Sequence, residues 1–195
     1  MRCPFLEEKQ GMKHIMLDLE TLGTSPDSCI MSIGAVRFDL DSDEIDDAGF
    51  YASVSIDSNL DSKRRIQEST LIWWMNQGTA AQGVFHESKQ TLAVALVDLS
   101  DWIGNGQCMV WSNGADFDLP MLAHAYTSLG IEIPWKYWNS KCFRTYKNLP
   151  GAKAVKVAFE GTKHNALFDA VHQAKHVQAI QAALFGGKKK ALVPT

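Results

Sequence analysis

The 195-residue sequence predicts a single mixed α/β domain, in which a central sheet is flanked by helices. Two observations lead to this prediction. Short segments rich in Ile, Val, Met, Phe and Tyr follow one another in the first third of the chain. Segments with helical periodicity then alternate with one further apolar run. The chain is long enough for one substantial core and too short for two comfortable domains.

Three strands are predicted first, over residues 13–19, 29–38 and 48–56, because segments of Gly, Asp and Ser separate these apolar stretches. We expect the three strands to form a meander. A helix is predicted next, capped by Ser69 and containing residues 71–74.

Residues 91–103 repeat apolar side chains at intervals of three and four, which predicts a second helix. The apolar run 108–111 predicts a buried strand between two glycine-containing turns. A helix is then predicted to open at Asp116 and to stop at Gly130. The last helix is predicted over residues 165–184, ended by two glycines.

Composition narrows the class of protein. The hydrophobic content is 46%, the formal net charge is −3, and no apolar run approaches the roughly 18 residues of a membrane span. The four cysteines are scattered without a Cys-x-x-Cys pair, so neither a thiolate zinc site nor a disulfide scaffold is indicated. We therefore predict a cytoplasmic protein without membrane contact, with a leader over residues 1–12, a domain over 13–187 and a basic tail over 188–195.

Two carboxylates, Asp18 and Glu20, lie at the end of the first predicted strand with one leucine between them. This spacing places both on one face of a strand, roughly 6 to 7 Å apart. Two anions at that distance repel each other unless a cation lies between them or one takes up a proton. Hard divalent cations prefer such oxygen ligands, although an acid pair at a strand end can also be a solvated edge.

A second acidic motif lies at the predicted turn between the strand ending at Trp111 and the following helix. Asp116 is the predicted functional acid, although it could be a plain N-cap. Asp118 competes for this role, and in the first helical turn it would be favoured by the helix dipole alone.

A third motif places His164 at the entry of the last helix and Asp169 one and a half turns inside it. Aspartate has poor helix propensity and a desolvation cost, which a ligand role would offset. Taken together, the motifs supply four carboxylates, which suit two hard cations about 3.5 to 4 Å apart in a phosphoryl-transfer site. A neutral imidazole can accept a proton from an attacking water.

In order and spacing, the three motifs resemble those of the DEDD exonucleases, which include proofreading domains, ribonuclease T and oligoribonuclease. The resemblance spans about residues 13–184 and rests on Asp-Leu-Glu-Thr, Asn-Gly-Ala-Asp-Phe-Asp and His-Asn-Ala-Leu-Phe-Asp-Ala. His164 lies five residues before Asp169, as in the histidine branch, termed DEDDh. The tyrosine branch would need Tyr where this chain has Asn165.

The resemblance implies a ribonuclease H-like fold, with a mixed central sheet flanked by helices. It also implies a 3′→5′ exonuclease that releases nucleoside 5′-monophosphates from single-stranded RNA or DNA. By the same resemblance, two Mg²⁺ or Mn²⁺ ions would be held around the scissile phosphate, and His164 would deprotonate the attacking water. The implied metal ligands, which are also counted as catalytic, are Asp18, Glu20, Asp116 and Asp169.

Three residues after the first strand are candidates to contact the terminal nucleotide. The backbone of Thr21 and Leu22, next to Gly23, could meet it. The Leu22 side chain could wedge against the base or could simply pack in the core.

Three aromatic residues, Trp73, Trp74 and Phe117, are candidates to stack on bases, each stack contributing roughly 1 to 3 kcal/mol. Adjacent tryptophans on a helix point about 100° apart, which predicts that one is in the core and the other exposed. Within the histidine branch, Trp73-Trp74, the motif around Asn113-Gly114-Ala115 and the segment Cys142-Phe-Arg-Thr-Tyr are similar to stand-alone, exonuclease VIII-like enzymes of bacteria and their viruses.

Three further interpretations stay open. The chain could be a nucleic-acid-binding module that has lost its chemistry, although five intact site residues count against this. It could also be a structure-selective endonuclease on the same fold. Relatives are often homodimers, so the basic run 63–65 could serve a neighbouring subunit's site.

Overall fold

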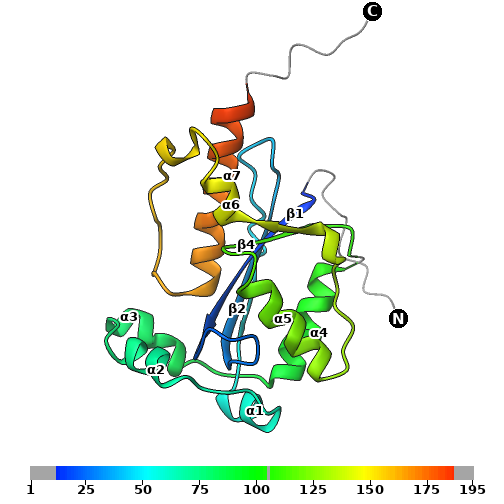
Figure 1. The fold of residues 1–195 in the computed structure, drawn as a ribbon, viewed down its shortest axis with the longest axis vertical. Helices are drawn as coiled ribbons and strands as arrows, with labels where there is room; N and C mark the ends of the chain where they lie inside the picture. Colours follow the sequence, from blue (N-terminus) through cyan, green and yellow to red (C-terminus); the bar gives the residue numbers. More distant parts are fainter. Residues whose placement is uncertain (1–11, 105, 187–195) are drawn as a thin grey trace, which may run out of the picture.

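A computed structural model describes residues 12–104 and 106–186 of the chain. Its five-stranded mixed sheet has the order β3-β2-β1-β4-β5 and carries helices on both faces (Figure 1). The strands are β1 (His14–Thr21), β2 (Ile30–Phe38), β3 (Phe50–Ser53), β4 (Met109–Ser112) and β5 (Ser140–Cys142). The helices are α1 (Ile56–Asp61), α2 (Glu68–Met75), α3 (Thr79–Gln82), α4 (Leu92–Ile103), α5 (Asp118–Ser128), α6 (Phe143–Lys147) and α7 (Ala166–Phe185), with short 3-10 turns at Gly83–Phe85, Tyr137–Asn139 and Ala152–Ala154.

The central strand β1 runs antiparallel to β2 and parallel to β4. Its alternate side chains enter two different cores, as the period of a strand requires. Ile15 and Leu17 pack in the core beneath α4 and α5, whereas Met16 packs in the core beneath α7. The alternation continues along the strand, so Asp18 and Glu20 emerge on the α7 side of the sheet.

The long helix α7 covers that side of the sheet and begins close to β2. Asn165 caps the helix, because its side-chain oxygen accepts from the N–H groups of Leu167 and Phe168. Gly34 of β2 makes the close approach possible, since a Cβ at this position would overlap the backbone of Ala166 and Leu167. Gly34 pairs with Asp18 across the sheet, so the start of α7 is held beside the acid-bearing part of β1.

Much of the predicted secondary structure is confirmed. The first three strands form the expected meander, and the helices predicted over 91–103 and 165–184 correspond to α4 and α7. The predicted cap Ser69 is wrong: it lies inside α2, whose N-cap is Gln67. The helix predicted to open at Asp116 begins two residues later.

The predicted leader, apart from Met12, and the predicted basic tail lie outside the described residues. Within the described ranges, none of the helices is both long enough and apolar enough to cross a membrane.

Candidate active site

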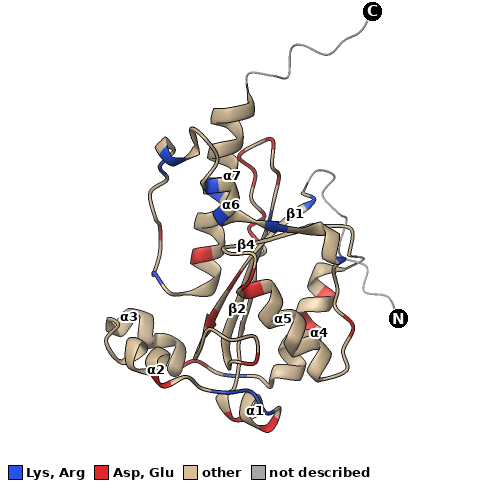
Figure 2. Ribbon diagram, viewed as in Figure 1, with Lys and Arg blue, Asp and Glu red and all other residues tan. Residues whose placement is uncertain are grey.

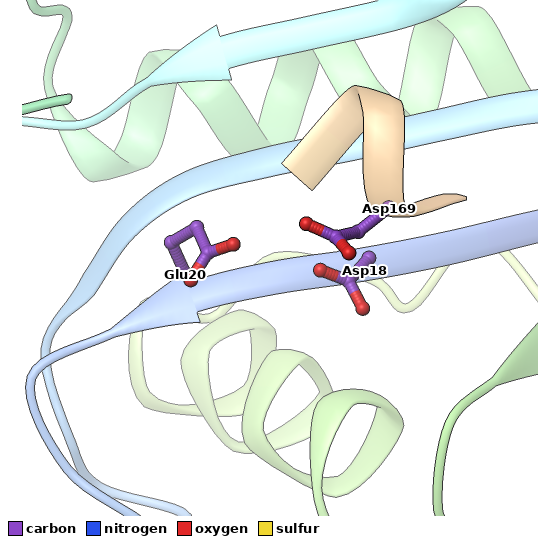
Figure 3. A group of neighbouring side chains, drawn as sticks. All are labelled: Asp18, Glu20 and Asp169. Atoms are coloured by element: carbon purple, nitrogen blue, oxygen red, sulfur yellow. The ribbon is translucent and has the colours of Figure 1, made fainter. Parts of the chain in front are cut away.

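Three carboxylates meet on the α7 side of β1. Asp18 and Glu20 come from the strand and Asp169 comes from the first turn of α7, and each offers an oxygen within 4.8 Å of the others. Figure 3 shows the three side chains turned toward one another. The structure therefore brings together three of the four acids that the sequence singled out.

The fourth acid beside them is Asp118, whereas the sequence predicted Asp116 in this place. Asp116 is exposed in the turn that precedes α5. Asp118 is only 3% exposed, and its charge acts directly on both Asp18 and Glu20. The helix begins at Asp118, so this residue lies at the N-terminus of α5 beside the acids of β1. Asp116 lies in the preceding loop and faces solvent.

The four acids share a strongly electronegative, desolvated environment. Burial, followed by the charges of the other three acids, raises the pKa of Asp18 well above its ordinary value. Burial, followed by the charges of Asp169 and Asp118, raises the pKa of Glu20 to about 8. Burial raises the pKa of Asp118 to about 7, against backbone hydrogen bonds that lower it. Burial also raises the pKa of Asp169.

Gln173 is a site residue that the sequence analysis missed. Its Nε2 donates to Oδ1 of Asp18 at 2.7 Å, whereas its Oε1 is buried without a hydrogen-bond partner among the described residues. A signal was available, because Gln173 follows Asp169 by four residues and therefore lies on the same helix face. Gln173 orients the Asp18 carboxylate toward the other acids.

The four acids fit a divalent metal site. They are hard oxygen ligands and they are mostly buried, which raises their pKa values, and like charges act on Asp18 and Glu20 in addition. The buried Oε1 of Gln173 also lacks a donor that a metal-bound water could supply. A cation would relieve both conditions.

His164 lies at the entrance to this acid cluster. Its backbone N–H donates to Oδ2 of Asp169 at 2.8 Å, and its φ of 61° is a left-handed conformation uncommon for a residue with a side chain. The imidazole ring packs edge to face against Trp73, with ring centroids 5.0 Å apart, and against Trp74 at 6.2 Å. Helix α2 therefore supports the histidine that the sequence predicted.

The two tryptophans differ as predicted. Trp74 is 1% exposed and donates from its indole N–H to the carbonyl of Thr21 at 2.9 Å, whereas Trp73 is 42% exposed. Phe117 is half-buried and packs against the core beneath α4 and α5. Of the three, Trp73 offers the most exposed ring.

The side chain of Leu22 does not form a wedge. It is 1% exposed and packs in a small core with Trp74, which favours the core-packing alternative. Thr21 is likewise buried, and its hydroxyl donates to the carbonyl of Gly23 at 2.8 Å. A Cβ on Gly23 would overlap Ser28, so this position contributes backbone alone.

The basic run 63–65 is largely engaged within the fold. Arg64 is 2% exposed, and its guanidinium donates to the carbonyls of Ser28 and Pro26. Arg65 forms an ion pair with Asp27 at 2.7 Å. The suggestion that the whole run serves a neighbouring subunit is therefore wrong for Arg64.

Comparisons with known proteins agree with this geometry. The model of the family described as "3′-5′ exoribonuclease Rv2179c-like domain" matches residues 13–181. Among curated proteins, no match was found.

Solved structures share the fold at low sequence identity. Cell-death related nuclease 4 (CRN-4) superposes with a TM-score of 0.61 and 12% identity over 89% of this chain. A zinc-bound complex of E. coli exonuclease I with single-stranded DNA gives 0.65 and 12% over 89%, and exonuclease I from Methylocaldum szegediense gives 0.62 and 13% over 88%. The chain spans 65%, 41% and 40% of these longer proteins, respectively.

Proposed function

This chain belongs to the family of 3′-5′ exoribonuclease Rv2179c-like domains, and from that membership we propose that it removes nucleoside 5′-monophosphates from the 3′ ends of single-stranded RNA. The observation that carries the proposal is the convergence of four buried or partly buried acids next to His164. A mixed sheet with an acid pair on its central strand supplies the first two, and the starts of two helices supply the others.

We assign the metal ligands to Asp18, Glu20, Asp118 and Asp169, which would hold two Mg²⁺ or Mn²⁺ ions. When bound, such ions lower the pKa of water and offset charge on the phosphate. Burial raises the pKa values of all four acids, and neighbouring acids raise those of Asp18 and Glu20 further. A divalent ion would compensate these charges, which is the reason to expect cation binding.

His164 is assigned as the acceptor of the proton from the attacking water. Its backbone hydrogen bond to Asp169 links the histidine to the acid cluster, and the edge-to-face contact with Trp73 restricts the ring. His164 and Asp169 are thus linked within one short segment, residues 164–169.

Trp73 is assigned as the platform for the base of the terminal nucleotide. It is the exposed member of the tryptophan pair and adjoins His164. A π-face accepts any base, so this contact gives affinity without strong sequence preference. The backbone carbonyl of Thr21 lies next to α2, since it accepts from the indole N–H of Trp74.

The test uses 5′-labelled single-stranded RNA and single-stranded DNA, incubated with Mg²⁺, with Mn²⁺ or with EDTA. A metal-dependent ladder that shortens from the 3′ end, and is lost in Asp169→Asn, supports the proposal. Cleavage of circular RNA would favour the endonuclease interpretation. Metal-dependent RNA binding without any cleavage would favour the non-catalytic module.

The homodimer is also a proposal and rests on the resemblance alone. Size-exclusion chromatography with light scattering checks it, and a single monomeric mass across the working concentration range would remove it.

A further inference from the structure

The guanidinium of Arg144, on α6, lies beside the loop that leads to Asp118. Its Nη2 donates to the carbonyl of Asn113 at 2.9 Å. The same guanidinium packs against Gly114, because a Cβ built on this glycine would lie 3.6 Å from the Arg144 Cζ. Gly114 has a φ of 144°, which favours glycine, so the loop both needs this glycine and presents a bare backbone to the arginine.

Arg144 is also an electrostatic neighbour of the acid cluster. Its charge lowers the pKa of Asp118, whose carboxylate in turn accepts a hydrogen bond from the backbone of Asn113. Asn113 thus contacts both the guanidinium of Arg144 and the carboxylate of Asp118. Figure 2 shows basic positions on α6 and acidic positions near the starts of α5 and α7.

Most of the N–H donors of the Arg144 guanidinium are available to bind a ligand. The side chain is exposed, and the ion pairs found among residues 12–104 and 106–186 are Arg65 with Asp27 and Lys175 with Glu160. A guanidinium has five N–H donors in a planar fork that matches phosphate oxygens, and the carbonyl of Asn113 takes up one of them.

We propose that Arg144 binds a non-bridging oxygen of the phosphodiester at the cleavage site. This inference rests on the proposed nuclease function and deepens it. A cluster of four acids repels a phosphodiester, and two divalent ions balance the four acids, so part of the phosphate's own charge is left for a protein cation to meet. That charge grows as the phosphoryl group is attacked, so a fixed guanidinium stabilises the transition state more than the bound substrate.

The alternative role for Arg144 is to brace the Asn113–Asp118 loop. The two roles make opposite predictions for metal binding in the absence of RNA. If Arg144 braces the loop, its removal displaces Asp118 and weakens metal affinity. If it binds phosphate, removal of a cation near Asp118 leaves metal affinity unchanged or raises it.

The experiment compares Arg144→Gln and Arg144→Lys with a matched control, Lys147→Gln. Lys147 is an exposed cation on the same helix, but its ammonium lies over the ring of Phe143, 5.7 Å from its centroid, and its charge acts on His176. Two quantities are measured on each variant: kcat/KM for an octaribonucleotide across a series of KCl concentrations, and Mn²⁺ affinity by calorimetry without RNA.

We expect Arg144→Gln to lower kcat/KM by about 10- to 100-fold. The slope of log kcat/KM against log[KCl] should become shallower by about 0.7, the value for one phosphate contact to a single strand. Mn²⁺ affinity should not fall. Arg144→Lys should recover part of the loss, because it restores the charge without the planar fork.

Two results would overturn the inference. In the first, Arg144→Gln matches Lys147→Gln in rate and salt slope. In the second, the Mn²⁺ affinity of Arg144→Gln falls by the same factor as its kcat/KM, which would show that Arg144 holds the Asn113–Asp118 loop in place. If Arg144→Gln fails to fold, Arg144→Lys decides on kcat/KM at one KCl concentration and on Mn²⁺ affinity, because it keeps the charge that sets the salt slope. Absence of cleavage by the unmodified chain on every substrate would instead defeat the proposed function itself.

Discussion

Gln173 donates a hydrogen bond to the carboxylate of Asp18 at 2.7 Å, across 155 residues of sequence. The bond joins α7 to the central strand at the point where the acids meet. It also holds one oxygen of Asp18, Oδ1, against the amide of Gln173. An amide from the helix therefore sets the geometry of an acid on the sheet.

The first prediction concerns this bond. Gln173→Leu should lower Mn²⁺ affinity by about 10- to 100-fold, the usual cost of losing a group that orients a metal ligand. Calorimetric titration of the RNA-free protein measures this directly. Gln181→Leu is the matched control, because Gln181 lies on the same helix but contacts Tyr146, away from the acids. Equal affinities in the two variants would show that Gln173 does not orient Asp18.

The second prediction separates Asp118 from Asp116. Asp118→Asn should lower kcat by about 10³-fold, because it removes an anion from the metal site. Asp116→Asn should stay within about threefold of the parent, since that side chain is exposed in the turn. The two isosteric substitutions lie two residues apart, and turnover of labelled RNA at saturating Mg²⁺ measures both. Loss of activity in Asp116→Asn with activity retained in Asp118→Asn would restore the original assignment.

The choice between Asp116 and Asp118 could not be made from the sequence. Asp116 precedes α5 and Asp118 is its first residue. Which of the two acids reaches the site depends on the exact residue at which the helix starts. Helix ends are set by local hydrogen bonds and packing that periodicity does not resolve. By contrast, the order of the other acids and His164 was visible in the sequence, because strand alternation and helix position are fixed by spacing alone.

Other features depended on tertiary contacts. The edge strand β5 has three residues and no alternating pattern, so it was not predicted. The sequence does not show which of Trp73 and Trp74 is exposed. The hydrogen bond from the indole of Trp74 to the carbonyl of Thr21 places Trp74 in the core. Gly34 was unremarkable in the sequence, although it sets how closely α7 approaches β2.

The third prediction concerns pH and the stability of the metal-free protein. The pKa of Glu20 is raised from 4.5 to about 8 and that of Asp118 from 3.8 to about 7. Between about pH 4.5 and 8 the folded state therefore holds protons that the unfolded chain releases, so the free energy of unfolding falls as pH rises. The fall should be on the order of 5 kcal/mol between pH 5.5 and 8.

Thermal or urea unfolding in EDTA, at a series of pH values, measures this fall. Saturating Mg²⁺ should remove most of it, because the ion compensates the same charges. Glu20→Gln should raise the stability of the metal-free protein at pH 8 and flatten the profile. A stability that rises from pH 5.5 to 8 in EDTA would contradict the prediction.

The fourth prediction concerns the tryptophan pair. Trp74→Ala should destabilise the fold by about 3 to 5 kcal/mol, because the indole is buried. Trp73→Ala should change stability far less and should raise KM for RNA by about 5- to 50-fold through lost stacking. Trp73→Phe keeps an aromatic face and should recover much of the affinity. Equal destabilisation by both alanine variants, with no change in KM for Trp73→Ala, would assign both residues to the core.

The fifth prediction concerns Gly34, which controls the distance between α7 and the strand. Gly34→Ala introduces a Cβ that would overlap the backbone of Ala166 and Leu167, so the start of the helix must move away from the sheet. Such overpacking costs about 1 to 3 kcal/mol of stability. Because Asp169 is carried by the same helical turns, metal affinity should fall as well.

Gly78→Ala is the matched control, since no heavy atom lies within 4 Å of a Cβ at that position and its φ is −68°. Unfolding measurements and Mn²⁺ titration on both variants separate the effect of the added methyl group from that of losing a glycine. If Gly34→Ala loses stability but binds Mn²⁺ like the parent chain, the helix has adjusted without moving Asp169. The position of the acid would then be fixed by its hydrogen bond with the His164 backbone rather than by the contact between α7 and β2.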